Sequence, residues 1–132
     1  MVIRDEAYSR GLVLVVEDNK GMREAIDNLL DAAGYSGIAY ASADALIAGG
    51  RVEDGLCVVS DIKLPGMSGF DLVTELRERG TLTPVVLIAA NGGAAARRKA
   101  KRRGAAAYLE KPFAGSALLA AVESVAGPGR PK

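Results

Sequence analysis

Residues 56–76, LCVVSDIKLPGMSGFDLVTEL, contain one strand, one loop and the start of one helix, and this order decides the fold. The apolar run Leu56–Val59 has the length and composition of a strand buried on both faces of a sheet. Phe70, Val73 and Leu76 then recur at helical spacing. A strand followed by a helix predicts a parallel sheet, because parallel strands need a crossover connection between them.

The same alternation continues in both directions along the chain. Four more apolar runs predict strands, at Leu12–Val16, Gly37–Tyr40, Val85–Ala90 and Ala105–Leu109. Helical patterns follow them at Met22–Ala33, Asp44–Gly49, Ala94–Arg103 and around Leu118, Val122 and Val125. Five strand–helix units with right-handed crossovers predict a doubly wound, three-layer α/β sandwich.

Length and composition predict one folded domain. The chain has 132 residues, of which 49% are hydrophobic and 25% charged, and it shows no repeat or linker. We expect an extension at residues 1–10, the domain at residues 11–126 and a flexible tail at residues 127–132. The first ten residues do not form a secretion signal, and no apolar run is long enough to span a bilayer. A cytoplasmic location is therefore expected.

The residue types that are missing exclude several kinds of chemistry. The chain has no histidine, which excludes histidine acid–base catalysis, histidine-bound zinc and a phosphohistidine carrier. Its one cysteine, Cys57, lies in an apolar run and is expected to be a buried hydrophobic residue, not a reactive thiol. Any chemistry must therefore use carboxylates, lysines and the backbone.

Charged side chains follow three of the predicted strands. Glu17 and Asp18 follow the first strand, Asp61 the third and Lys111 the fifth. Because ligands bind beyond the carboxyl ends of parallel strands, these side chains are expected to converge at one edge of the sheet. Three close carboxylates call for a hard cation such as Mg²⁺, and a lysine suits an incoming phosphate. The pattern predicts a magnesium-dependent aspartyl-phosphate site.

Each of these residues also has a simpler interpretation. Glu17 and Asp18 could cap the helix that follows, Asp61 could be an ordinary loop acid, and Lys111–Pro112 could be a surface turn. The combination of acids after the first and third strands with a lysine after the fifth favours the phosphate site.

Four stretches together resemble a known family. They are LVLVVEDN at residues 12–19, VVSDIKLPGMSGFDLV at 58–73, PVVLIAA at 84–90 and GAAAYLEKPF at 104–113. In this order and spacing they resemble the receiver domain of bacterial two-component response regulators, and LPGMSG and EKPF most resemble receivers of the nitrogen-fixation regulator type. The resemblance covers residues 11–126. We expect either a single-domain regulator or a receiver cut from a longer protein such as a hybrid kinase, and the sequence mildly favours the former.

The resemblance implies both a fold and a function. The fold is flavodoxin-like, with strand order 2-1-3-4-5. Asp61 is implied to be the phosphoacceptor, which takes a phosphoryl group from a sensor histidine kinase or a phosphotransfer protein. The resemblance implies no conventional enzyme, although such a domain can promote its own phosphorylation and dephosphorylation at Asp61.

It also implies roles for the residues around Asp61. Asp18 and Asp61 would bind Mg²⁺ directly, Glu17 would act through water, and the backbone carbonyl of Lys63 would be a further ligand. Lys111 would contact the phosphoryl oxygens. The peptide bond between Lys111 and Pro112 would be cis, which would fix where the lysine points.

One position departs from the family pattern. Ala89 stands where receivers carry a threonine or serine whose hydroxyl binds the phosphoryl group, although Tyr108 occupies the expected aromatic position on strand five. Ser60 is no substitute, because strand alternation points it away from Asp61. A lost hydrogen bond to a charged group is worth about 1.5–3 kcal/mol. We therefore expect phosphorylation to be retained while the conformational output is weakened or rewired.

Positive charge is concentrated near the C-terminus. Residues 1–96 hold 8 basic and 14 acidic side chains, whereas residues 97–132 hold 9 and 2, and six of the basic ones lie at Arg97–Arg103. A downstream protein partner is expected at this basic helix, with the following strand and helix. An acidic protein or a solvated surface is favoured over DNA, because no aromatic residues are interleaved with the cations. We expect a monomer or a weak homodimer.

Two other functions compete with a working receiver. A degenerate receiver would use the same fold for protein docking without regulated phosphorylation, and Ala89 would then mark decay. A hydrolase of the haloacid dehalogenase type also uses an aspartyl nucleophile, but it needs a second acid two residues later, where this chain has Lys63. The complete set of acids and lysine favours the working receiver.

Overall fold

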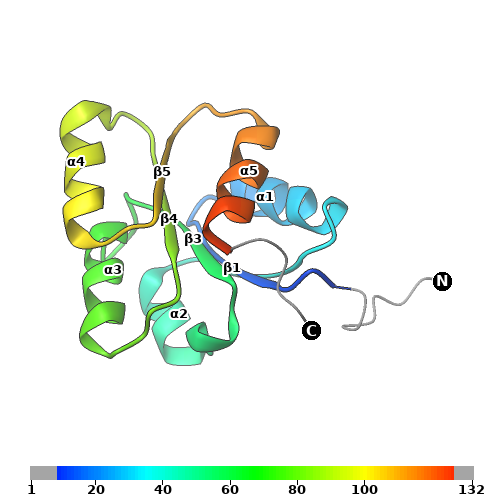
Figure 1. Ribbon diagram of the computed structural model, residues 1–132, viewed down its shortest axis with the longest axis horizontal. Coiled ribbons are helices and arrows are strands. Elements are labelled where there is room, and N and C mark those ends of the chain that lie inside the picture. Colours follow the sequence, from blue (N-terminus) through cyan, green and yellow to red (C-terminus); the bar gives the residue numbers. More distant parts are fainter. Residues whose placement is uncertain (1–8, 127–132) are drawn as a thin grey trace.

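The computed structural model describes residues 9–126, which form a five-stranded parallel sheet with helices on both faces (Figure 1). The strands are β1 (Leu12–Val16), β2 (Ser36–Tyr40), β3 (Cys57–Asp61), β4 (Val85–Ala89) and β5 (Ala107–Glu110). The helices are α1 (Lys20–Ala32), α2 (Ala43–Gly49), α3 (Gly69–Glu78), α4 (Gly93–Arg103) and α5 (Gly115–Ala126), with a short 3-10 turn, η2 (Val52–Asp54). The strand order is β2-β1-β3-β4-β5, which confirms the predicted fold class and topology. The expected tail and most of the expected extension lie outside the described residues.

The sheet separates two apolar layers. Alternate strand residues point to opposite faces, so Val13 and Val15 pack with α1 and α5, whereas Leu14 and Val16 pack with α2 and α3. Figure 1 shows the same division, with α2, α3 and α4 on one side of the sheet and α1 and α5 on the other. The central strands β3 and β4 are buried along their whole length, which explains their nearly unbroken apolar sequences.

Two strands extend further toward the charged edge than their apolar runs predict. β3 includes Asp61, which pairs with Ile88 of β4, and β5 includes Glu110, which pairs with Ala89. Parallel pairing depends on the backbone and not on side-chain polarity, so the ladder continues past the last apolar residue. As a result, Asp61 is held by a strand and not by a mobile loop.

Most of the helix starts follow the expected capping chemistry. Asn19, Ser42 and Ser68 each accept a hydrogen bond from a backbone N–H in the first turn of α1, α2 and α3. α4 differs, because its N-cap is Gly92, which has no side chain to offer. The first turn of α4 therefore depends on other elements for its partners.

Cys57 is fully buried at the start of β3, as the sequence predicts. Burial raises the pKa of its thiol to about 12, so the thiol stays protonated at neutral pH. Within residues 9–126, no helix is both long enough and apolar enough to cross a membrane.

Candidate functional site

The fold brings the predicted charged residues together at one edge of the sheet. One carboxylate oxygen from each of Glu17, Asp18 and Asp61 lies within 4.8 Å of the other two. Lys111 reaches into this group, with its Nζ 3.0 Å from Asp61 Oδ2 and 3.4 Å from Glu17 Oε1. We call these four residues the acidic cluster. Three acids and one lysine leave an excess of negative charge, which suits a bound cation.

Burial makes the acidic cluster electrostatically sensitive. Glu17 and Asp61 are only 1% and 6% exposed, whereas Asp18 is exposed. Burial raises the pKa of Glu17, and the charge of Asp61 adds to this, although Lys111 opposes it. Burial lowers the pKa of Lys111, but its contacts with Asp61 and Glu17 outweigh that effect and raise the pKa overall. Lys111 is therefore held as a cation between the two buried acids.

The loop between β1 and α1 is held by several side chains. Asn19, and not Glu17 or Asp18, caps α1, because its Oδ1 accepts from the Met22 N–H at 2.8 Å. The Asn19 N–H donates to Glu17 Oε2 at 3.1 Å and so orients that carboxylate. The interpretation of the two acids as simple helix caps is therefore wrong, and their carboxylates lie close to that of Asp61.

The residues beside Asp61 lie as the strand pattern predicts. Ser60 packs on the opposite side of the sheet from Asp61, and its hydroxyl donates to the Asp61 carbonyl at 2.9 Å. The Lys63 N–H lies 3.4 Å from Asp61 Oδ1, and the Lys63 side chain is exposed. The Lys111–Pro112 peptide bond is cis, as the resemblance predicts.

Ala89, Gly92 and Tyr108 form a second feature, which we call the aromatic corner. Tyr108 is 9% exposed, and its buried hydroxyl has no hydrogen-bond partner among the described residues. A side chain at position 92 would overlap that hydroxyl, and its Cβ would lie 3.1 Å from Ala89 Cβ. The Tyr108 ring therefore points inward, with its hydroxyl in space that Gly92 leaves open next to the side chain of Ala89.

The basic helix α4 is not simply a solvated surface, because three of its six cations contact side chains of neighbouring elements. The Arg97 guanidinium lies 4.7 Å from the Tyr108 ring centre, and Lys99 Nζ lies 4.5 Å from that of Phe70. Arg103 Nη1 donates to Thr74 Oγ1 at 3.1 Å. The other three cations lie at helical spacing on one side of α4, at Arg98, Lys101 and Arg102, and these three and Arg97 are exposed.

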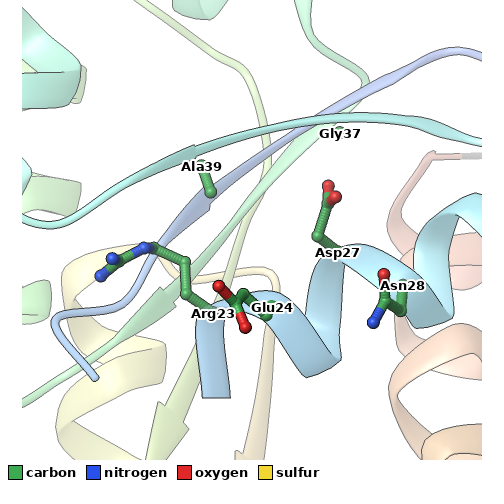
Figure 2. Close-up of a pocket in the computed structure, with 6 residues that line it drawn as sticks. All are labelled: Arg23, Glu24, Asp27, Asn28, Gly37 and Ala39. Atoms are coloured by element: carbon green, nitrogen blue, oxygen red, sulfur yellow. The ribbon is translucent and has the colours of Figure 1, made fainter. Parts of the chain in front are cut away.

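A shallow groove of about 220 Å³ lies between α1 and the edge strand β2. Gly37 and Ala39 form its floor, and the polar side chains of α1 form its wall (Figure 2). The groove is separate from the acidic cluster. Arg23 links the two, because it lines the groove while its Nη1 donates to the carbonyls of Glu17 and Asp18.

Comparison with known proteins agrees with this geometry. The family described as response regulator receiver domain matches residues 13–123. This chain belongs to that family. One curated relative is the transcriptional regulatory protein FixJ of Azorhizobium caulinodans, which is 36% identical over 87% of this chain and 54% of the relative. Another is the response regulator protein FleR of Pseudomonas aeruginosa, which is 40% identical over 81% of this chain and 23% of the relative. The receiver domain thus spans about half the length of these relatives, or less.

Solved structures support the same assignment. The response regulator StyR is 36% identical, with a TM-score of 0.79 over 86% of this chain and 57% of that one. The chemotaxis protein CheY4 of Vibrio cholerae is 27% identical, with a TM-score of 0.79 over 86% of this chain and 97% of that one. The chain is thus a receiver domain of the two-component type, and its acidic cluster fits a phosphoacceptor site. Neither the degenerate receiver nor the hydrolase is better supported.

Three contributing residues are missing from the sequence-based site. Arg23 binds the loop that carries two of the acids, Gly92 makes room for Tyr108, and the Glu110 carboxylate accepts the Gly93 N–H at 2.8 Å. Arg23 had a usable signal, because a cation in the first turn of a helix is unfavourable there and needs another reason. Gly92 and Glu110 had none, since their roles depend on contacts between distant elements.

Proposed function

We propose that this receiver domain accepts a phosphoryl group on Asp61 in the presence of Mg²⁺. The observation that carries the proposal is the contact of Lys111 with Asp61 and Glu17 at the edge where three carboxylates meet. The cytoplasmic location expected from the sequence is part of the same proposal.

The transfer needs a nucleophile and a compensating charge. A carboxylate oxygen of Asp61 attacks the phosphorus of a phosphohistidine and forms a new P–O bond. The P–N bond breaks, and its electron pair leaves with the imidazole of the donor. Lys111 Nζ, 3.0 Å from Asp61 Oδ2, moves its hydrogen bond to an oxygen of the new acyl phosphate.

The acidic cluster also fits the metal that this chemistry needs. Mg²⁺ prefers oxygen ligands, and Glu17, Asp18 and Asp61 offer carboxylate oxygens within 4.8 Å of one another. Asp18 and Asp61 would hold the ion directly, with Glu17 acting through water and the Lys63 carbonyl as a further ligand. When bound, Mg²⁺ neutralises charge on the transferring group and keeps it in line with the nucleophile.

Receiver domains interact with histidine kinases or phosphotransfer proteins, and we propose a sensor histidine kinase or a phosphotransfer protein as the donor here. For the output, we propose that the face made by α4, β5 and α5 docks a protein. The four exposed cations of α4 favour an acidic segment of that partner, and they are Arg97, Arg98, Lys101 and Arg102. Four cations would neutralise too few phosphates for strong DNA binding at physiological salt.

Ala89 bears on this output more than on metal binding. The missing hydroxyl would have linked the phosphoryl group to the end of β4. Tyr108 already points inward without this hydroxyl, so phosphorylation would change the orientation of its ring little. We therefore propose that phosphorylation is retained while its conformational effect on the aromatic corner is weak.

The proposal is tested by titrating the protein with beryllofluoride and Mg²⁺, a mimic of phosphorylated aspartate, and following the backbone amides by NMR. We expect saturable shifts near Asp61, Ala89 and Lys111 that the Asp61→Asn variant lacks. Absence of any Asp61-dependent response would reject the phosphoacceptor and leave a docking module. Shifts that extend through Tyr108 and residues 94–103 would show that the conformational output works without the hydroxyl.

A further inference from the structure

Arg23 of α1 makes an unusual pair of contacts. Its Nη1 donates to the Glu17 carbonyl at 2.9 Å and lies 3.3 Å from the Asp18 carbonyl. Figure 2 shows the side chain extending from α1 toward the chain that follows β1. A single guanidinium therefore holds the backbone of both acids that β1 supplies to the acidic cluster.

Helix stability does not explain this arginine. α1 has no acidic residue in its first turn and carries Lys20 and Arg23 there instead, where positive charge opposes the helix dipole. Lys20 lies 3.9 Å from Glu24, an ordinary surface ion pair. Within residues 9–126, Arg23 forms no ion pair, although Glu24 and Asp27 line the same groove. Its Nη1 donates to the two carbonyls instead.

The two acids differ in how their side chains are held. The Glu17 carboxylate accepts from the Asn19 N–H at 3.1 Å and lies 3.4 Å from Lys111. The Asp18 carboxylate is exposed and accepts no hydrogen bond from the described residues. The position of the Asp18 carboxylate therefore depends on its backbone, and Arg23 contacts that backbone.

We propose that Arg23 is a positioning residue for the metal and phosphoryl chemistry of the acidic cluster. It fixes the backbone after β1 so that the carboxylates of Glu17 and Asp18 face Asp61 against their mutual repulsion. This inference rests on the proposed function, because it concerns how the same site binds its cation. Groups that orient metal ligands typically change metal affinity by about 10- to 100-fold when they are removed.

Removing Arg23 would weaken Mg²⁺ binding if the residue positions the ligands, whereas electrostatics alone predicts stronger binding. Arg23 is a cation close to a cation-binding site, so removing its charge would relieve repulsion and strengthen Mg²⁺ binding. A positioning role requires Mg²⁺ binding to become weaker. The sign of the change therefore separates the two explanations.

The test compares Arg23→Met, Arg23→Lys and the control Lys20→Met in Mg²⁺ titrations followed by NMR. Lys20→Met removes the same charge from the same turn without touching the carbonyls. We expect Mg²⁺ binding to weaken about 10-fold in Arg23→Met and by a smaller factor in Arg23→Lys, which keeps one donor. Lys20→Met is expected to bind Mg²⁺ as the wild type does, or slightly more tightly.

A second readout needs no metal. In metal-free protein, the amides of Asp18 and Asn19 are expected to exchange with solvent faster in Arg23→Met than in Lys20→Met, because the loop has lost its anchor. If Arg23→Met binds Mg²⁺ as tightly as Lys20→Met does, the positioning role is rejected while the proposed function stands. If the wild type itself gives no saturable Mg²⁺ response, the proposed function fails and this inference fails with it. Should Arg23→Met not fold, wild-type Mg²⁺ affinity in Arg23→Lys would reject the inference.

Discussion

The acidic cluster and the aromatic corner lie at the same edge of the sheet, but they differ in how completely their polar groups are connected. In the acidic cluster, Lys111 contacts two of the acids, and neighbouring groups hold the loops that carry them. In the aromatic corner, the buried Tyr108 hydroxyl has no hydrogen-bond partner among the described residues, and Ala89 supplies no hydroxyl. The groups needed for phosphoryl transfer are therefore present, whereas the groups that would change conformation in response to it are incomplete. Four substitutions test this contrast.

The largest effect is expected from Lys111→Met. This change leaves Glu17 and Asp61 buried without their cation, and breaking a buried pair in this way typically costs 3–5 kcal/mol. Because Lys111 is 22% exposed, we expect a loss of about 3 kcal/mol in the free energy of urea unfolding. Added Mg²⁺ should restore more stability to this variant than to the wild type, because it supplies the missing charge.

Lys63→Met is the matched control for that experiment. It removes the same charge from the same edge of the sheet, but the Lys63 side chain is exposed. We expect its unfolding free energy to stay close to that of the wild type. Equal losses in both variants would mean that net charge, and not the contact with the buried acids, sets the stability.

The next effect concerns the aromatic corner and follows from Gly92→Ala. The added Cβ would overlap the Tyr108 hydroxyl, so the ring must leave its buried position or the loop must move. Overpacking of this kind costs about 1–3 kcal/mol, and we expect about 2 kcal/mol. NMR of the Tyr108 ring should show it exposed to solvent. In the control Gly49→Ala the added methyl meets no atom within 4 Å, and stability should not fall. A Tyr108 ring that stays buried in Gly92→Ala would contradict the packing described here.

Much of the acidic cluster could be predicted from the sequence because its signals are local. Glu17, Asp61 and Lys111 each stand at the end of an apolar run, and parallel strands bring their carboxyl ends to one edge. The strand order and the cis bond before Pro112 came from the family resemblance and are confirmed by the structure.

The aromatic corner could be predicted only in part, because its arrangement depends on side-chain packing between distant elements. The sequence predicts that Tyr108 lies on the last strand, but its direction depends on Gly92, which lies 16 positions earlier in the chain. The contact of Arg97 with the Tyr108 ring likewise arises from the packing of α4 on β5. A run of charged residues in a sequence indicates a surface, but it does not show which cations will contact neighbouring helices and strands.

A smaller effect is expected when the missing hydroxyl is restored by Ala89→Thr. A hydrogen bond to a charged group is worth about 1.5–3 kcal/mol, so beryllofluoride should bind about 10-fold more tightly. Ala89→Val is the matched control, because it adds a side chain of nearly the same volume without the hydroxyl and should give no gain. The NMR shifts should also extend further into α4 in the threonine variant. Equal affinities in the two variants would show that the alanine does not limit the site.

The smallest effect is expected at Glu110, which replaces the side-chain cap that α4 lacks. Its carboxylate accepts the Gly93 N–H at 2.8 Å and places negative charge at the start of a helix with no acid in its first turn. Such a contact is worth about 0.3–1 kcal/mol, so Glu110→Ala should speed amide exchange at Gly93 and Ala94 only a few-fold.

Two further variants serve as controls for Glu110→Ala. Glu110→Gln keeps an acceptor without the charge, and the exposed Glu78→Gln on α3 controls for lost charge elsewhere. Protection that persists in Glu110→Ala would show that α4 is held by its packing alone. Faster exchange confined to the Glu110 variants would show that β5, next to Lys111, holds the start of α4.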